Sequence, residues 1–320
     1  MTVLVLTRDS DATGDLVIAQ LNDRGVPVHR LDPGDFPEAV RLSARLCEGP
    51  ARWEGVLHGR HRDLSLADVR SVYYRRPSHF RLHPGLTKQE AKWAEGEARA
   101  GMAGLLASLD CTWVNHPHRN AAAEVKPRTL AAAVRCGLRV PRTLITNEPE
   151  QARAFVESLP GRVAAYKALG PGGTTERQGI DCALWTNRVR AEQITGGVAR
   201  TAHQFQEWID KAYEVRLTIV AGQVFAAEIH AGSEASRIDF RTDYDSLTYK
   251  VCPVPDRIAQ GVRELADTFK LHYAALDFLV DGDGEWFLVD VNPNGQFGFV
   301  PDLQEPVARA LADLLEGRSR

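Results

Sequence analysis

The sequence predicts a protein of the α/β and α+β classes, divided into two or three units. Its first 31 residues follow the order strand, helix, strand, which is typical of a βαβ unit. Strand and helix patterns alternate again after residue 120. With 320 residues, of which 44% are hydrophobic, the chain is long enough to form more than one core.

The first 117 residues are expected to form an α/β domain. The turn after the first strand has no glycine fingerprint, so no dinucleotide site is expected there. Arg75 and Arg76 end a strand, where they form either a solvated edge or a surface for an anionic partner. The expected elements are strands at 3–6 and 26–31, a helix at 15–24, a hairpin at 40–46 and 52–57, a strand at 71–74, one long helix at 87–109 and a strand at 111–115.

Composition excludes several classes of protein. The net charge of −3 provides no overall field that would attract nucleic acid or anionic lipid. The five cysteines are scattered and include no CxxC pair, which indicates reduced thiols rather than disulfides or a zinc site. No basic segment precedes the short apolar start, and no apolar run reaches the length of roughly 20 residues that spans a membrane. We therefore expect a soluble, cytoplasmic protein that contacts no membrane.

The segment 273–299 predicts two strands joined by an Asp-Gly turn at 281–284. Asp277 and Asp290 each interrupt an apolar strand, and Asn292 lies two residues after Asp290, on the same face of an extended chain. Buried carboxylates need a partner, and three oxygen donors suit Mg²⁺. A plain hairpin with polar residues near its turn is the alternative.

Two lysines stand in unusual places between residues 120 and 180. Lys126 lies at the start of a helix that has Pro127 in its first turn and runs through 129–135, and its charge opposes the helix dipole unless an anion is near. Lys167 interrupts the apolar strand at 162–169 and needs a negative partner. The glycine-rich loop 170–179, with Gly172 and Gly173, follows directly and could hold phosphates through backbone N–H groups. Surface lysines and a mobile hairpin are the alternatives.

The segment 204–231 predicts two or three consecutive strands. The first ends at Gln206, Glu207, Trp208 and Ile209, where backbone groups could meet a purine edge. Glu214 and Arg216 share one face of the second strand and would form either a ribose contact or a cross-strand ion pair. The other expected elements are a strand at 140–146, a helix at 148–159, a polar loop or irregular strand at 236–250 and a final helix at 303–315.

This order of parts resembles the ATP-grasp superfamily over nearly the whole chain. More narrowly, it is similar to the graspetide synthetases, ATP-grasp enzymes that install ester or amide rings in ribosomally made peptides. The motifs that carry the narrower resemblance are YYRRP, NHP, KPRTL before GLRVPRTLITN, YEVRLTIVAGQVFA, DFR and VDVNPNGQF. A proline follows the first lysine, and His230 stands where some relatives have arginine.

The resemblance implies a pre-ATP-grasp domain at 1–117, a central subdomain at 118–202 and a C-terminal subdomain at 203–320. It implies that the protein binds ATP with Mg²⁺, two ions being expected, and a precursor peptide with leader and core. It also suggests a homodimer. Nucleic acid is not expected as a partner, given the net charge. The implied roles are phosphate binding by Lys126, Lys167, Gly172 and Gly173, adenine binding by residues 206–209, ribose binding by Glu214, magnesium binding by Asp277, Asp290 and Asn292, and catalysis by Arg216, Asp239 and Arg241.

The implied reaction activates an Asp or Glu side chain of the peptide as an acyl phosphate and joins it to a Thr or Ser hydroxyl or a Lys amine. One alternative is a ligase of the same fold that adds free amino acids or small amines to a carboxylate. An alternative of another class is a protein without catalytic activity that binds a leader peptide.

Overall fold

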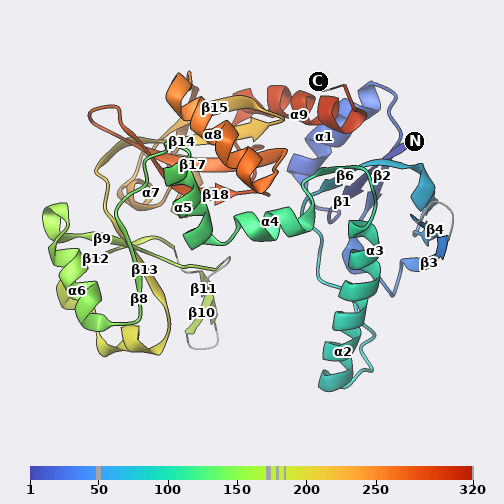
Figure 1. Ribbon diagram of the computed structural model, residues 1–320, viewed down its shortest axis with the longest axis horizontal. Helices are drawn as coiled ribbons and strands as arrows, with labels where there is room; N and C mark the ends of the chain where they lie inside the picture. Colours follow the sequence, from blue (N-terminus) through green and yellow to red (C-terminus); the bar gives the residue numbers. More distant parts are fainter. Residues whose placement is uncertain (48–51, 171–173, 178–179, 184, 319–320) are drawn as a thin grey trace. The chain divides into compact units, whose positions relative to one another are not determined.

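The structure is a computed structural model, and it divides the chain into two compact units (Figure 1). The first unit contains Met1–Asn120, Leu271–Tyr273 and Gln296–Arg320, and the second contains Ala121–Lys270 and Ala274–Gly295. The described residues are 1–47, 52–170, 174–177, 180–183 and 185–318, and the side chains of 174–177 and 180–183 are not among the described parts.

A parallel sheet in the order β2-β1-β6-β7 forms the centre of the first unit. Val3, Leu4 and Val5 of β1 are fully buried, as expected for a central strand with both faces covered. Helices α1 and α9 lie side by side, and α9 contacts β6 and β7 (Figure 1). These elements, which confirm the βαβ prediction, are β1 (Thr2–Leu6), α1 (Ala12–Asp23), β2 (Val28–Leu31), β6 (Val69–Tyr74), β7 (Thr112–Val114) and α9 (Pro301–Glu316).

A second, antiparallel sheet of the first unit contains the predicted hairpin, as β3 (Arg41–Cys47) and β4 (Arg52–His58), with β5 (Asp63–Ser65) beside it. The prediction of one long helix at 87–109 was wrong in one respect. Helix α2 (Lys88–Ala98) passes through a π-helical stretch, Arg99–Ala103, before α3 (Gly104–Ala107).

Arg75 does not form the solvated edge that its position at a strand end suggested. Its side chain is 1% exposed, and its Nε lies 3.5 Å from Oδ2 of Asp11. The same carboxylate oxygen accepts a hydrogen bond of 2.8 Å from the Thr7 hydroxyl. Arg75 is therefore part of the interior of the first unit, where a buried charge requires such a partner.

Asn115 fixes the point where the chain enters strand β17 (Tyr273–Asp281). Its Oδ1 accepts hydrogen bonds from the backbone N–H groups of His272 and Tyr273, at 2.8 and 3.0 Å. Its Nδ2 donates to the carbonyl of Tyr273 at 2.8 Å. The Asn115 side chain is buried, so it replaces the pairing that a neighbouring strand would otherwise give these backbone groups.

The second unit contains two larger sheets, in the orders β12-β9-β13-β8 and β16-β15-β14-β17-β18. Helix α6 covers the first, and Val156 on this helix belongs to the same core as Phe205 of β13. Helices α5 and α8 contact each other. Helix α5 also contacts β18 of the second sheet, and helix α8 contacts β14. The strands are β8 (Thr143–Thr146), β9 (Ala164–Lys167), β12 (Asn187–Val189), β13 (His203–Glu207), β14 (Lys211–Val220), β15 (Gln223–His230), β16 (Thr248–Val251), β17 and β18 (Trp286–Asn292), and the helices are α4 (Pro117–Ala123, which begins in the first unit), α5 (Lys126–Arg135), α6 (Pro149–Glu157), α7 (Glu234–Ile238) and α8 (Asp256–Phe269).

Helix α5 agrees with the prediction, since it begins at Lys126 and has Pro127 in its first turn, where proline is well tolerated. Several other elements of the second unit differ from the prediction. The segment 236–250 is not a continuous loop, since it contains the end of α7, two short 3₁₀ turns and β16. Helices α4 and α8 and strand β12 were not predicted. The predicted loop 170–179 includes strand β10 (Thr174–Arg177), which forms a hairpin with β11 (Ile180–Ala183). Gly172 and Gly173 lie outside the described residues.

Neither sulfur pairing nor membrane insertion is indicated by the described residues. Cys47, Cys111, Cys136 and Cys252 are free thiols. No helix in the described ranges combines the length and the apolar character needed to cross a bilayer.

We predict that Asn115→Ala lowers the free energy of unfolding by about 3 kcal/mol, because it leaves buried backbone groups of His272 and Tyr273 without their partner. Urea denaturation followed by circular dichroism measures this change. The control is Asn22→Ala on the exposed face of α1, for which a change within about 0.5 kcal/mol is expected. Equal stability of the two variants would contradict the anchoring role of Asn115.

Candidate functional site

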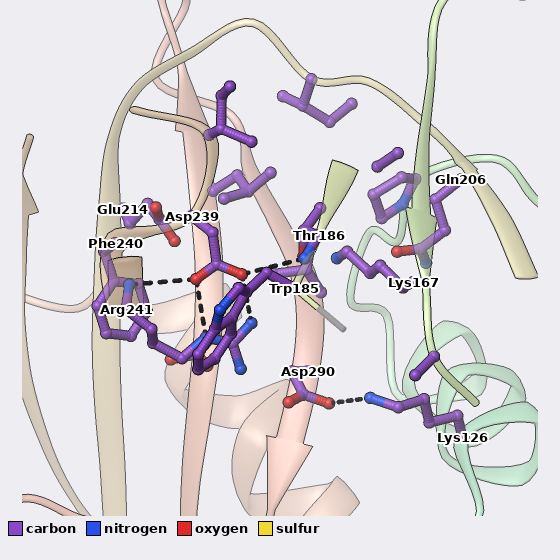
Figure 2. Close-up of a pocket in the computed structure, with 18 of the residues that line it drawn as sticks. Lys126, Lys167, Trp185, Thr186, Gln206, Glu214, Asp239, Phe240, Arg241 and Asp290 are labelled. Atoms are coloured by element: carbon purple, nitrogen blue, oxygen red, sulfur yellow. Dashed lines mark hydrogen bonds and ion pairs between the residues drawn. The ribbon is translucent and has the colours of Figure 1, made fainter. Parts of the chain in front are cut away.

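A cavity of about 400 Å³ lies in the second unit, which is a volume typical of small-molecule sites. Strands of both larger sheets and the start of α5 contribute to its wall (Figure 2). The predicted site residues that line it are Lys126, Lys167, Gln206, Glu207, Trp208, Ile209, Glu214, Asp239, Arg241, Asp277, Asp290 and Asn292. The structure thus gathers residues that are up to 166 positions apart, from Lys126 to Asn292.

Two carboxylates face each other at the floor of the cavity. Asp277 of β17 and Asp290 of β18 are direct partners in the strand register. Oδ1 of Asp277 lies 3.0 Å from Nη1 of Arg216, and Oδ1 of Asp290 accepts a hydrogen bond of 2.8 Å from Nζ of Lys126. Each carboxylate therefore has a cation from a different element beside it.

The two carboxylates differ in how readily they ionise. Burial raises the pKa of Asp277, although the Arg216 guanidinium opposes this effect. Burial also disfavours the ionised form of Asp290, but the Lys126 ammonium outweighs it, so that the pKa of Asp290 is lowered. Oδ1 of Asp277 is buried and accepts no hydrogen bond within the described residues, so this oxygen could accept a further cation.

Asn292, the third predicted metal ligand, also lines the cavity. Its Oδ1 accepts a hydrogen bond of 2.9 Å from the backbone N–H of Asn294, which orients the side chain. No group of three or more His, Cys, Asp or Glu side chains suited to a metal occurs within the described residues. The candidate set of two carboxylates and one amide contains fewer acidic side chains than such a group, and it would leave positions for water or phosphate oxygens.

Lys167 ends strand β9 and extends toward the cavity, as Lys126 does from the start of α5 (Figure 2). It forms no ion pair with any described residue. Burial lowers its pKa from 10.5 to about 8, with the Asp290 carboxylate opposing the change. A buried lysine with this pKa is a strong candidate for binding an anion.

Residues at the end of β13 line the same cavity. Gln206 is 1% exposed, and its Nε2 donates a hydrogen bond of 3.0 Å to the Thr143 hydroxyl. The strand ends at Glu207. The ring centroid of the next residue, Trp208, lies 4.2 Å from Cζ of Arg188. The apolar side chains of Ile209 and Leu279 form part of the wall, as a flat aromatic ligand would require.

Glu214 and Arg216 share a face of β14. The cross-strand ion pair considered from sequence occurs at Arg216, with Asp277 on the neighbouring strand β17, whereas Glu214 pairs within its own strand. Oε1 of Glu214 accepts a hydrogen bond of 2.7 Å from Nζ of Lys211, whereas Arg216 lies beside Asp277. Burial raises the pKa of Glu214, and Lys211 opposes the change. Arg216 is not among the residues that line the cavity.

Asp239 and Arg241 form a rigid pair opposite the two lysines (Figure 2). Arg241 donates from Nε to Oδ1 of Asp239 at 2.8 Å and from Nη2 to Oδ2 at 2.7 Å. Burial acts to raise the pKa of Asp239, but these hydrogen bonds outweigh it and lower that pKa. The pair holds a guanidinium in a fixed orientation at the rim of the cavity.

The lining residues that the sequence reasoning missed include Lys211, Trp185, Thr186 and Phe240. The position of Lys211, three residues before Glu214 at the start of a strand, could have indicated the ion pair. Trp185 and Thr186 follow the β10–β11 hairpin, and no local pattern signals their contact with Asp239 and Arg241.

Comparisons with known proteins agree with this architecture. A family model described as the MvdD pre-ATP grasp domain matches residues 2–121, and one described as the RimK-like ATP-grasp domain matches residues 123–314. A search of curated proteins by sequence gave no match.

Three solved structures are similar over nearly their whole length. The first is a RiPP-associated ATP-grasp ligase of Chryseobacterium gregarium in complex with ADP and a leader and core peptide, with 27% identity and a TM-score of 0.91 over 100% of this chain and 97% of that one. The second is the macrocyclase MdnC bound with precursor peptide MdnA from Microcystis aeruginosa MRC, with 27% identity and a TM-score of 0.87 over 99% of this chain and 100% of that one. The third is the macrocyclase MdnB from the same organism, with 27% identity and a TM-score of 0.79 over 98% of each chain.

These matches confirm the predicted fold and the resemblance to graspetide synthetases. Since the RimK-like model covers more than half of the sequence, the chain belongs to the RimK-like ATP-grasp family, with a pre-ATP-grasp domain of the MvdD type in front.

Proposed function

We propose that this ATP-grasp ligase is a macrocyclase of a ribosomally made precursor peptide. The observation that carries the proposal is the cavity that joins two lysines, two facing carboxylates and the Asp239–Arg241 pair. The similar structures with ADP and precursor peptides support the substrate class. The proposed domain boundaries are 1–117, 118–202 and 203–320.

In the proposed reaction, a carboxylate oxygen of a peptide Asp or Glu attacks the γ-phosphorus of ATP, and ADP leaves. The resulting acyl phosphate is attacked at its carbonyl carbon by a Thr or Ser hydroxyl or a Lys amine. Phosphate leaves, and the attacking group loses its proton. Such a reaction depends on alignment and on neutralising phosphate charge, which the arrangement of cationic side chains supports.

Each residue has a proposed role in this scheme. Lys126 and Lys167 would hold phosphate oxygens, and the backbone at 206–209 would hold adenine between apolar side chains. Glu214, fixed by Lys211, would accept from the ribose hydroxyls. Asp239 and Arg241 would orient the peptide carboxylate, and Arg216 would support catalysis through its contact with Asp277.

The residues present fit a magnesium ion, because the two carboxylates are adjacent in register and one buried oxygen of Asp277 accepts no hydrogen bond within the described residues. Asp277, Asp290 and Asn292 would hold the ion. When bound, Mg²⁺ would neutralise charge on the phosphates. We also propose that two Mg²⁺ ions bind and that the protein is a homodimer in the cytoplasm.

The function is tested with the purified chain, ATP, Mg²⁺ and the candidate precursor, a peptide rich in Thr and Glu or Asp that is encoded by a short neighbouring gene. Mass spectrometry should detect the loss of one water per ring formed. Gain of an amino-acid residue would instead indicate a ligase of free amino acids. Peptide binding without consumption of ATP would indicate a binding protein.

We predict that Asp290→Ala and Lys167→Ala each reduce turnover at least about a hundredfold, because each removes a charge that stabilises the transferring phosphoryl group. ADP release with the candidate precursor measures the rate. Asp283→Ala in the exposed hairpin turn and Lys88→Ala on exposed α2 are matched controls with expected normal rates. Rates near normal in the first two variants would refute their assigned roles.

We predict that the protein takes up a proton when it binds nucleotide at a pH about one unit above 8. In the free chain the pKa of Lys167 is about 8, so its amine is mostly neutral there. Bound phosphates raise this pKa and favour the ammonium form, whereas well below pH 8 the amine is already charged and binding takes up no proton from it. The affinity for nucleotide should therefore decrease as the pH rises through the pKa that Lys167 has in the free chain.

Calorimetric titration of ATP in two buffers of different ionisation enthalpy measures this uptake. In the control variant, Lys167→Arg, the side chain stays charged and the uptake should disappear. Identical uptake by both proteins would exclude Lys167 as its source.

A further inference from the structure

Arg241 is in cation–π contact with two aromatic rings. The centroid of the Trp185 ring is 5.4 Å from its Cζ, and that of the Phe240 ring is 5.9 Å away. Both distances are within the range of cation–π attraction. Phe240 is buried, whereas the Trp185 ring is 41% exposed and lines the cavity. Trp185 is therefore the more exposed of the two aromatic residues that contact the guanidinium.

A second contact fixes Trp185 in this place. The backbone N–H of the next residue, Thr186, donates a hydrogen bond of 3.3 Å to Oδ2 of Asp239, which is 4% exposed. Trp185 and Thr186 follow β11, whereas Asp239 and Arg241 follow α7. Two segments far apart in sequence thus meet at this one guanidinium.

The hydrogen bonds of Arg241 leave one edge for a ligand. Asp239 occupies the edge formed by Nε and Nη2. Nη1 makes no hydrogen bond with any described residue, so the edge formed by Nη1 and the second N–H of Nη2 can still receive a carboxylate through two parallel bonds.

We propose that Trp185 is a positioning residue of the peptide-carboxylate subsite, where it orients Arg241 and shields the activated carboxyl group from water. The proposal rests on the macrocyclase function argued above. An indole ring over a guanidinium removes water from the ion pair, which strengthens it. The same ring would keep water from the acyl phosphate, whose hydrolysis returns the carboxylate and releases phosphate without a ring bond.

Kinetics with the candidate precursor test both roles. For Trp185→Ala we expect the KM for the peptide to rise about tenfold, as for loss of a partly desolvated cation–π contact, while ATP affinity measured without peptide stays normal. The ratio of ADP released to rings formed should rise above that of the unaltered chain. Trp185→Phe should restore much of both properties, and Trp93→Ala, on the exposed surface of α2, is the matched control.

A change in fold alone would not alter the ratio of ADP to rings in folded protein. A normal peptide KM and a normal ratio in Trp185→Ala would overturn the proposal and leave the macrocyclase function intact. If the unaltered chain forms no rings, the proposed function fails instead.

A binding experiment tests the subsite without any turnover. With 5-fluorotryptophan in all six tryptophan positions, Trp185→Phe identifies the ¹⁹F resonance of residue 185. N-acetyl-glutamate amide should shift this resonance, and its glutamine analogue should not. No shift with the glutamate probe, or equal shifts with both, would contradict the assignment.

Discussion

The electrostatic balance of two adjacent carboxylates is the constraint on which the rest of the second unit depends. Asp277 and Asp290 are register partners on β17 and β18, surrounded by apolar strand residues. Two carboxylates this close cannot both ionise without nearby cations. Lys126 and Arg216 meet that need in the structure, and each comes from an element outside the hairpin.

The elements around the hairpin serve this balance. Helix α5 begins at Lys126, which brings an ammonium group to Asp290 at the cost of an unfavourable charge at a helix start. Lys167 remains without an ion-pair partner among the described residues, so an anionic ligand would complete the set of charges. In the proposed reaction, a metal ion held by Asp277, Asp290 and Asn292 would take over the role of Lys126 and Arg216, and Lys126 would then be available to phosphate.

Much of this arrangement could be predicted, because its charged residues interrupt apolar patterns in the sequence. Asp277, Asp290 and Lys167 each stand out in a strand of buried residues, and the structure gathers them in one cavity. Helix α8 could also have been predicted, since Ile258, Val262, Leu265 and Phe269 follow its buried face. The π-helical stretch in the helix after Thr87, the interior position of Arg75 and the place of Trp185 depend on contacts between distant segments, which no local pattern encodes.

The central claim is that a divalent cation binds between Asp277 and Asp290 and displaces their side-chain cations. The most direct measurement is anomalous diffraction from crystals grown with Mn²⁺ and a non-hydrolysable ATP analogue. We expect a manganese peak between the two carboxylates, with Nζ of Lys126 moved from Asp290 to a phosphate oxygen. Bound nucleotide without a peak at this position, with Lys126 and Arg216 still paired to the carboxylates, would contradict the claim.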